Sequence, residues 1–315
     1  MMAIGRDTIV TVIGGSGFIG RYVVEKLARH GCLVRVAVRR PERALFLKTS
    51  GEIGQITPLA VNIRDPQSIA AVVSGAQAVI NLVGILYQSG PQRFDAVQAE
   101  GAGHVARAAQ AAGVEKLIHL SAIGADPVSP AAYARSKAAG EAGVRAAFPA
   151  ATILRPSIVF GPEDQFFNRF ASMAMVSPVL PLIGGKTRFQ PVYVGDVAEA
   201  VVAALLRPEA AGQLYELGGP RIYTFRALMQ LMLRLIDRRR CLISLPFPLA
   251  SLQAALLQVL PTPPLTLDQV RLLRRDNIVD PQAKSLADLD IVPRSVESLA
   301  PVYLDRFRPQ GETTI

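Results

Sequence analysis

The sequence contains no tryptophan, only two cysteines and only three histidines. Cys32 and Cys241 lie far apart and have neither the spacing of a metal site nor the pattern of a disulfide framework. We therefore expect both thiols to be small buried groups of a protein that works in a reducing, cytoplasmic setting. The histidines are scattered, and we predict no metal-binding or catalytic role for them: His30, His104 and His119.

Charged residues are also scarce, at 19% of the chain, whereas 50% of the residues are hydrophobic. With 315 residues, the chain can bury a large core and form a main domain with a smaller lobe. No stretch is a clean membrane span, because prolines and polar residues interrupt the nearest candidate, 241–260. The N-terminus lacks a signal-peptide pattern, so we expect a cytoplasmic protein.

The most specific local signal is a glycine run behind the β-branched residues 8–13, which are typical of a strand buried on both faces. The glycines are spaced by three, and a helical pattern starts among them: Gly14, Gly17, Phe18, Ile19 and Gly20. Such glycines permit a tight turn, the approach of a pyrophosphate and close helix–strand packing, while helix N–H groups hold the phosphate charge. A turn without a ligand is the alternative, but the order of strand, glycines and helix predicts a dinucleotide site.

The second predicted strand, 33–38, should end where the adenosine ribose of the nucleotide lies. NAD-specific folds place an acidic residue there, whereas an arginine accommodates the 2′-phosphate of NADP. Arg39 and Arg40 follow this strand, and a guanidinium can bind phosphate bidentately. We therefore favour NADP(H) over NAD(H). Glu42 is an alternative as an NAD-type acid, and the two arginines could instead form a solvated loop.

Strand-like and helical patterns alternate through the first half, which predicts an α/β fold of the Rossmann type, a doubly wound parallel sheet covered by helices on both faces. Further strands are predicted at 55–61, 78–83 and 116–121, with long helices at 93–112 and 131–148. Ligands of such sheets bind beyond the carboxyl ends of the strands. Small or polar residues occur at these ends: Asn62, Asp65, Asn81, Gly84 and Ser121.

Three of these residues, Asn62, Asn81 and Gly84, are candidates for contacts with the cofactor. Asn62 and Asp65 could contact adenine, but each could equally cap a helix or a turn. For Asp65, which directly precedes a proline, we predict the capping role.

Tyr133 and Lys137 stand four residues apart on a predicted helix and therefore share one of its faces. A free phenol has a pKa of about 10, and we expect the neighbouring ammonium to lower it toward the range of acid–base catalysis. Lys137 can also bond a nicotinamide ribose, and Ser121 can polarise a substrate oxygen. The same spacing arises by chance on solvated helix faces, but behind Ser121 and the glycine turn it predicts a catalytic group of Ser121, Tyr133 and Lys137.

With these motifs the chain resembles the extended, or atypical, short-chain dehydrogenase/reductase family over roughly its first two-thirds. The matching segments are the three glycines, Ser121, 133–137 (YARSK) and 155–162 (RPSIVFGP). The resemblance implies a Rossmann domain with a bound pyridine nucleotide, contacted also by Pro156 and Ile158. The chain departs from the family at Ile13, where Thr is frequent, at Asn62, where an acid is common, and in the turn 81–84.

Beyond this region the chain also resembles the nucleotide-binding accessory subunits of respiratory complex I and their bacterial relatives. The similar segments are 148–149, 167–173 (FNRFASM), 190–197 (QPVYVGDV) and 245–249 (LPFPL). This resemblance implies a tightly held, structural NADP(H) and association with a membrane-bound quinone oxidoreductase. The alternative is a working NADP-dependent reductase, epimerase or dehydratase that uses Ser121, Tyr133 and Lys137.

The net charge of +9 concerns the choice of partner. Arginines flank the uncharged stretch 241–260 on both sides, and basic clusters beside apolar segments attract anionic headgroups or acidic proteins. Leucines after 249 lie near one helical face, and 170–185 is likewise uncharged, so both stretches could lie on a bilayer or pack in the smaller lobe. No motif indicates nucleic acid. We expect complex I subunits or an anionic membrane surface as partner, with a peripheral position on the inner membrane.

The second half is expected to be mainly helical. We predict a nucleotide-binding domain at 1–160 and a smaller lobe at 161–315, with segments around 190–206 returning to the core. A strand is expected at 151–156 and another at 213–217, followed by a helix from Thr224.

Overall fold

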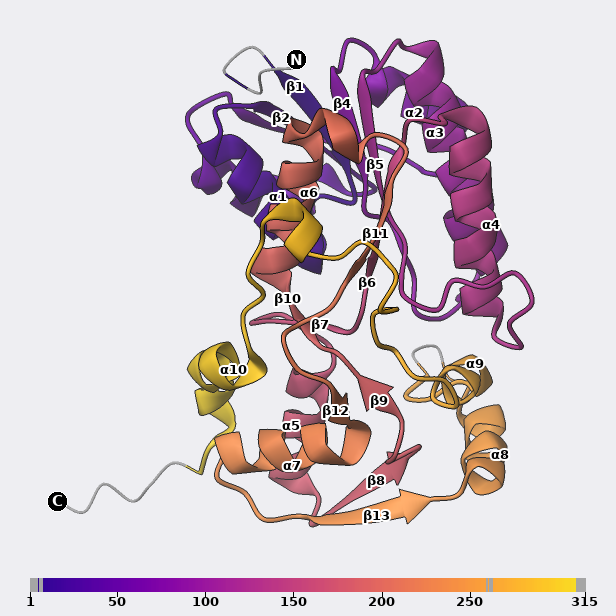
Figure 1. Cartoon of the computed structure of the whole chain (residues 1–315), viewed down its shortest axis with the longest axis vertical. Helices are drawn as coiled ribbons and strands as arrows, with labels where there is room; N and C mark the ends of the chain where they lie inside the picture. The colour runs from indigo at the N-terminus through magenta and orange to yellow at the C-terminus, as the bar shows by residue number, and fades with distance from the viewer. Residues whose placement is uncertain (1–4, 6–7, 259, 261–262, 310–315) are drawn as a thin grey trace, which may run out of the picture. The chain divides into compact units, whose positions relative to one another are not determined.

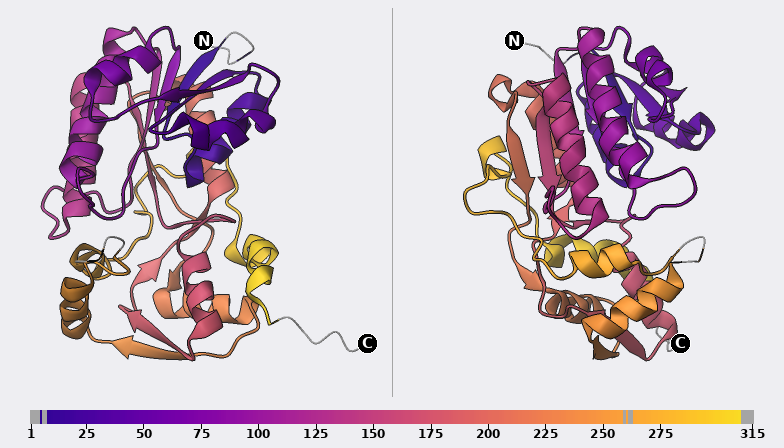
Figure 2. Two further views of the ribbon diagram at one scale, coloured as in Figure 1. Left: turned by 180° about the vertical axis from the view of Figure 1, so that it is seen from behind. Right: turned by 90° about the vertical axis from the view of Figure 1, so that its right-hand side faces the viewer.

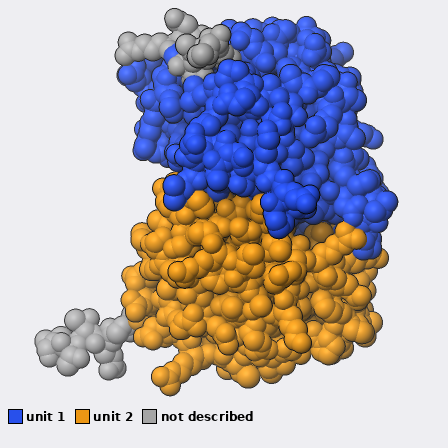
Figure 3. Space-filling model, viewed as in Figure 1, with its two compact units in different colours: residues 1–156, 194–217, 280–292 blue, residues 157–193, 218–279, 293–315 orange. Residues whose placement is uncertain are grey.

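A computed structural model describes residues 5, 8–258, 260 and 263–309 of the chain (Figure 1 and Figure 2). The chain divides into two compact units, each made of three segments of the sequence (Figure 3). Unit 1 comprises residues 1–156, 194–217 and 280–292, and unit 2 comprises 157–193, 218–279 and 293–315.

Unit 1 contains a parallel sheet of seven strands in the order β11-β6-β5-β4-β1-β2-β3. Its central strand β1 pairs with both β2 and β4, so the strand order reverses there, as in doubly wound dinucleotide-binding sheets. The predicted fold class is confirmed. The strands are β1 (Ile9–Ile13), β2 (Leu33–Val38), β3 (Ile56–Ala60), β4 (Ala78–Asn81), β5 (Lys116–Leu120), β6 (Thr152–Pro156) and β11 (Leu214–Leu217).

Helices cover both faces of this sheet (Figure 1), which explains why its central strands β1 and β4 are mostly apolar and buried. On one face α1 packs against α6, and on the other α3 packs against α2 and α4. The core between sheet and helices includes Ile13, Val79 and Leu117 from the strands. The helices are α1 (Phe18–Arg29), α2 (Pro66–Val73), α3 (Gly101–Ala111), α4 (Ala132–Ala147) and α6 (Val194–Leu206), with short helices η1 (Pro41–Ser50), η3 (Pro208–Ala210) and η4 (Ala287–Leu289).

The structure differs from the prediction of a single helix over residues 93–112. The first part of this range is a π-helical segment, η2 (Asp95–Glu100), and α3 starts only at Gly101. A π turn carries an additional residue per turn and changes which side chains face inward. Gln98 of this segment is buried, and its amide bonds two neighbouring elements.

A partly buried group of ion pairs joins α4, β6 and β11 in unit 1. The Arg155 guanidinium binds both oxygens of Glu141 on α4, with Nε and Nη2 at 2.8 and 2.7 Å, and Nη1 lies 3.5 Å from Glu216 on β11. These bonds raise the pKa of Arg155, with the Glu141 hydrogen bond as the largest cause. A backbone hydrogen bond joins the third segment of unit 1, residues 280–292, to β11, because Glu216 N donates to Lys284 O at 2.8 Å.

Unit 2 combines three short two-stranded sheets with five helices among its described residues. An aromatic core joins Phe160, Phe167 and Phe225, and Tyr303 donates to the buried Asp164 at 2.7 Å. The strand pairs are β7 (Val159–Phe160) with β10 (Val192–Tyr193), β9 (Arg188–Phe189) with β12 (Tyr223–Thr224), and β8 (Val179–Ile183) with β13 (Cys241–Leu245). The helices are α5 (Phe167–Val176), α7 (Phe225–Leu235), α8 (Phe247–Leu257), α9 (Leu267–Leu272) and α10 (Val296–Leu304), followed by η5 (Asp305–Phe307).

Both uncharged stretches of the second half are divided between a strand and a helix. The stretch 241–260 starts with β13, which pairs in parallel with β8 of the stretch 170–185, and only then forms α8. Within the described residues, no helix is long and apolar enough to cross a membrane. The expectation of two buried thiols is wrong for Cys241, which is exposed at the start of β13, whereas Cys32 is buried.

Candidate functional site

The glycine turn between β1 and α1 leaves no room for a side chain at Gly20 and favours glycine at Gly14. Gly14 has φ +85°, where glycine is favoured, and a Cβ on Gly20 would lie 2.5 Å from the Gly14 carbonyl oxygen. Helix α1 starts immediately after Gly17, with no side-chain cap and no acidic residue in its first turn. Its first-turn N–H groups, including those of Phe18 and Ile19, therefore keep the positive end of the helix open to an anion. This cradle fits a pyrophosphate.

At the end of β2, Arg39 and Arg40 are both exposed. Neither forms an ion pair within the described residues, so both guanidinium groups are available to a ligand. The next helix, η1, begins at Pro41 and carries Glu42, likewise exposed, in its first turn. The two arginines and Glu42, which are the alternative contacts of the adenosine ribose, are therefore all exposed near the end of β2.

Asn62 and Asp65 follow β3 and are used in local turns. Asp65 is the N-cap of α2, and its side chain accepts from Gln67 N at 3.0 Å, so the predicted capping role is confirmed. The Asn62 side-chain oxygen accepts from Arg64 N at 3.2 Å. This leaves the Asn62 amide NH₂ as the group that remains for an adenine contact.

Asn81 at the end of β4 is tied to the neighbouring strand. Its side-chain oxygen accepts from Val83 N at 3.1 Å, and its Nδ2 lies 3.3 Å from Nδ1 of His119 on β5. His119 is buried, and burial, with the Lys137 charge as a smaller cause, lowers its pKa to about 3. The ring is therefore neutral at physiological pH and can accept the Asn81 amide proton. The histidine is a structural partner of the candidate site that the sequence analysis did not identify.

Lys137 reaches from α4 to the carboxyl end of β5. Its Nζ donates to the Leu120 carbonyl oxygen at 3.2 Å, directly before Ser121. Burial lowers the pKa of Lys137 to about 8, although Glu141 one turn further along α4 acts in the opposite direction. Ser121 is buried as well, and within the described part of the chain its Oγ has no hydrogen-bond partner. An unsatisfied buried hydroxyl is costly, so this atom fits a ligand contact.

Tyr133 differs from the expectation for its acidity. The ring packs edge-to-face on Phe94, with ring centroids 5.8 Å apart, and burial raises the pKa of the phenol to about 12. The expected lowering by Lys137 is therefore wrong for this structure. A phenol with a raised pKa keeps its proton at neutral pH. Burial thus disfavours the phenolate form of Tyr133.

Gly84 and Gln98 complete the surroundings of Lys137. A Cβ at position 84 would lie 3.3 Å from Lys137 Nζ, so glycine permits the close approach of the ammonium. Gln98 accepts from Ile85 N at 3.2 Å and donates to Ser136 Oγ at 2.9 Å, which joins η2, the turn after β4 and α4. No motif in the sequence marks Gln98, because its role depends on the π-helical segment.

The last two cofactor candidates belong to different units. Pro156 ends β6 in unit 1, and its carbonyl oxygen accepts from Ile123 N at 3.0 Å. Ile158 belongs to unit 2, where its N–H donates to the Asn277 side-chain oxygen at 3.1 Å. The Ile158 amide is thus already used within its own unit. No group of three or more potential metal ligands occurs among the described residues.

The neutral, buried His119 predicts a pH-dependent stability. The unfolded histidine has a pKa of about 6.5 and the folded one about 3, so only the unfolded state gains a proton between these values. Stability from this residue is complete above pH 6.5 and is lost as the pH falls, by about 2 kcal/mol at about pH 5. Urea unfolding should therefore show a flatter pH profile over this interval for His119→Gln. His30→Gln, at an exposed position, is the control, and an equal flattening in it would contradict the assignment.

Comparisons with known proteins agree with this arrangement. Residues 10–218 match the NAD dependent epimerase/dehydratase family. The chain is 38% identical to subunit 9 of the mitochondrial NADH dehydrogenase [ubiquinone] 1 alpha subcomplex of Arabidopsis thaliana, over 96% of this chain and 79% of that protein. It is also 34% identical to the NADH-ubiquinone oxidoreductase 40 kDa subunit of Neurospora crassa (96% and 82%) and 32% identical to a ceramide reductase of Caulobacter vibrioides (78% and 76%).

Among solved structures, the NADPH-dependent quinone oxidoreductase QOR2 of Escherichia coli, complexed with NADPH, superimposes with a TM-score of 0.74 at 20% identity, over 93% of this chain and 99% of that one. A triphenylmethane reductase of Citrobacter sp., complexed with NADP(H), gives a TM-score of 0.72 at 16% identity, over 94% and 99%. At these identities the likeness is one of fold.

Proposed function

The chain belongs to the NAD dependent epimerase/dehydratase family, and from this we propose that unit 1 holds NADP(H) in an accessory component of a complex I-type NADH–quinone oxidoreductase. The observation that carries the proposal is the uncapped start of α1 behind the Gly14–Gly20 turn. The relatives named as complex I subunits support the partner, because they match nearly the whole chain rather than the nucleotide-binding part alone.

The residues that would hold the nucleotide come from successive strand ends of unit 1. The glycine turn would receive the pyrophosphate, and Arg39 with Arg40 the 2′-phosphate. Lys137 and Ser121 would contact the nicotinamide ribose and ring region, where Ser121 Oγ lacks a protein partner. Bound NADPH supplies a hydride donor. In the accessory role it would instead stabilise the fold, by about 4 kcal/mol at a thousandfold excess over Kd.

A catalytically active reductase is the second candidate, and one specific observation favours it. Ser121, Tyr133 and Lys137 are all present, and the buried Ser121 Oγ has no hydrogen-bond partner within the described residues, so it can contact a substrate oxygen. A protonated phenol can donate to a carbonyl oxygen that receives a hydride. The ceramide reductase among the relatives gives this reading a precedent in the family.

The two candidates are separated by single-turnover experiments. Native mass spectrometry of the purified chain is expected to detect bound NADP(H), and the bound NADPH is expected to persist in the presence of quinone and carbonyl compounds. Capture of complex I subunits by the tagged chain would support the accessory role. Oxidation of NADPH that disappears in Tyr133→Phe would overturn it in favour of the enzyme.

The cofactor preference is tested at the end of β2. Arg39→Gln with Arg40→Gln is expected to weaken NADPH binding by about 1–3 kcal/mol and to leave NADH binding nearly unchanged, because charge-assisted bonds to the 2′-phosphate are lost. Isothermal titration with both nucleotides measures the difference. Glu42→Gln is the matched control on the same turn. A larger loss of NADH binding in Glu42→Gln than in the arginine variant would reverse the assigned preference.

We also propose that the protein attaches peripherally to an anionic membrane surface, on the cytoplasmic face of the inner membrane. The support is α8 in unit 2, which buries Ala250 and Ala254 but exposes larger side chains on its other side. Leu249, Leu252 and Leu256 are 53%, 62% and 71% exposed. An exposed leucine row of this kind can lie in the interfacial layer of a bilayer.

A further inference from the structure

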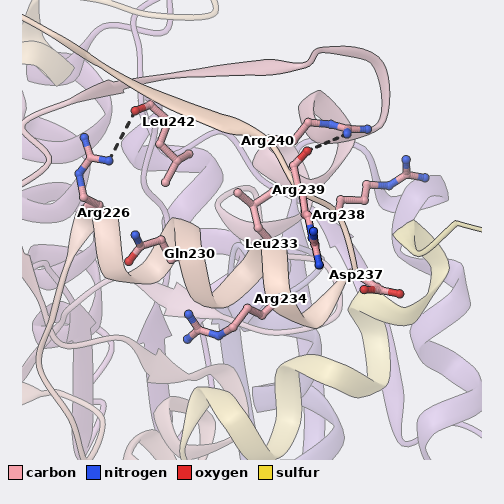
Figure 4. Close-up of a pocket in the computed structure, with 9 residues that line it drawn as sticks. All are labelled: Arg226, Gln230, Leu233, Arg234, Asp237, Arg238, Arg239, Arg240 and Leu242. Carbon is pink, nitrogen blue, oxygen red and sulfur yellow. Dashed lines mark hydrogen bonds between the residues drawn. The ribbon is translucent and has the colours of Figure 1, made fainter.

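Unit 2 contains a basic pocket between α7 and the chain that returns along β13. The pocket has a volume of about 620 Å³. Five guanidinium groups and one carboxylate line it, from Arg226, Arg234, Asp237, Arg238, Arg239 and Arg240 (Figure 4). We call it the arginine pocket. We propose that it binds the phosphate group of an anionic phospholipid, a step that deepens the proposed peripheral attachment and rests on it.

The end of α7 brings the arginines together. Arg226 and Arg234 are eight residues apart and lie on the same side of the helix. After Ile236 the chain reverses at Asp237, which has φ +49°, and Arg238 N bonds back to the Leu233 carbonyl oxygen at 3.0 Å. This helix-terminating turn places three further arginines, Arg238, Arg239 and Arg240, directly beside the end of α7.

The positive charge of the pocket is held in place but not neutralised. None of the five arginines forms an ion pair with a described residue, and Asp237 is the one carboxylate of the lining. Neutral groups fix three of the side chains: Arg226 Nη2 donates to Ser244 Oγ (2.8 Å), Arg238 Nε to Phe307 O (2.8 Å) and Arg240 Nε to Ala174 O (2.7 Å). The remaining N–H groups are donors, and guanidinium groups bind the oxygens of a phosphate bidentately.

Exposed apolar side chains beside the pocket favour a lipid as the source of the phosphate. Arg240 is bonded to the last turn of α5, and the two residues that follow this contact, Met175 and Val176, are 46% and 87% exposed. Ile243 of β13, three residues after Arg240, is 51% exposed. Binding of a soluble phosphate would not involve these apolar side chains. In a bilayer they would reach the acyl layer while the arginines bind at headgroup level.

Vesicle binding of the full chain tests the proposal, with phosphatidylcholine vesicles that contain or lack phosphatidylglycerol. Arg234→Gln with Arg239→Gln is expected to weaken binding to the anionic vesicles about 30-fold, since each charge at the surface contributes about 1 kcal/mol. Both residues are exposed and make no side-chain hydrogen bond within the described residues, so the variant should fold. Arg107→Gln with Arg145→Gln removes the same charge from exposed positions of unit 1 and should change binding less than about threefold.

A second variant acts in the opposite direction. Asp237→Asn removes the carboxylate of the arginine pocket and keeps a side chain that tolerates positive φ, so it should bind anionic vesicles about fivefold more tightly. NADPH affinity, measured on the same samples, should be unchanged in every variant.

Three results would overturn the proposal, and they can be told apart. If the two double variants lose the same affinity, vesicle binding depends only on the net charge of the protein. The arginine pocket then has no special role, although the peripheral attachment remains supported. If the unmodified chain does not bind anionic vesicles at all, the proposal of peripheral attachment is itself wrong. If it ignores vesicles but binds glycerol phosphate in a manner sensitive to Arg234→Gln with Arg239→Gln, the pocket serves a soluble phosphate and the lipid assignment is wrong.

Discussion

Alanine in place of Gly20 is expected to destabilise unit 1 by about 3 kcal/mol and to abolish NADPH binding. The added Cβ would lie 2.5 Å from the Gly14 carbonyl oxygen and 2.6 Å from that of Gly15. Both atoms are backbone, and Gly14 already has φ +85°, so relief requires the turn itself to move. Chemical denaturation measures the stability, and nucleotide titration of the folded fraction measures binding.

Gly17→Ala separates the two effects. At this position the new Cβ would meet a single atom, the Gly14 carbonyl oxygen at 3.2 Å, and the residue has an ordinary φ of −72°. The variant should therefore fold, with a loss of about 1 kcal/mol or less. NADPH binding should still weaken, because the methyl group stands where the pyrophosphate approaches the start of α1. Normal stability and normal NADPH affinity in Gly20→Ala would refute the role assigned to the turn.

The sheet of unit 1 could be predicted because its information is local. Each strand is a short apolar run that ends at a turn signal, and the bounds 33–38 agree with β2 residue for residue. The glycine spacing, the cap at Asp65 and the helix from Thr224 likewise depend on neighbours within a few residues. Parallel strands that are covered on both faces appear in the sequence as short apolar runs, and this pattern does not depend on the other segments of the chain.

The remainder depends on contacts between distant segments. Residues 241–245 belong to an uncharged stretch that the sequence does not divide, but they form β13 because β8, about sixty residues earlier, offers a pairing edge. The spacing of Tyr133 and Lys137 behind Ser121 predicts a phenol with a lowered pKa, whereas burial of the ring raises this pKa. Short-range patterns carry no information on burial produced by the tertiary structure.

The candidate site likewise contains residues that the sequence predicts and residues that only the tertiary structure reveals. The sequence located Ser121 and Lys137, and the bond from Lys137 to Leu120 O does bring the lysine to the serine's strand end. It did not reveal His119 and Gln98, which hold Asn81 and the turn after β4 in place. Such supporting residues become visible only when the strands and the π-helical segment are assembled.

Two glycines three residues apart on α4 should respond to alanine with opposite signs. A Cβ on Gly140 would lie 2.3 Å from the Gln98 carbonyl oxygen, so Gly140→Ala must displace the π-helical segment η2 from α4. We expect a loss of about 3 kcal/mol. At Gly143 the nearest atom would be the Gly103 Cα at 3.6 Å, an ordinary contact, and Gly143→Ala should gain up to about 1 kcal/mol from helix propensity.

The same pair tests whether η2 supports the nucleotide site. Displacing η2 moves Gln98, whose amide holds Ile85 and Ser136 beside Lys137. Gly140→Ala should therefore weaken NADPH binding as well as stability, whereas Gly143→Ala should leave the affinity unchanged. Thermal unfolding with and without NADPH provides both readings from one series. If Gly140→Ala lowered the melting temperature but kept the full NADPH-induced shift, η2 would stabilise unit 1 without positioning the lysine, because the affinity for the nucleotide would then be independent of the contact between η2 and α4.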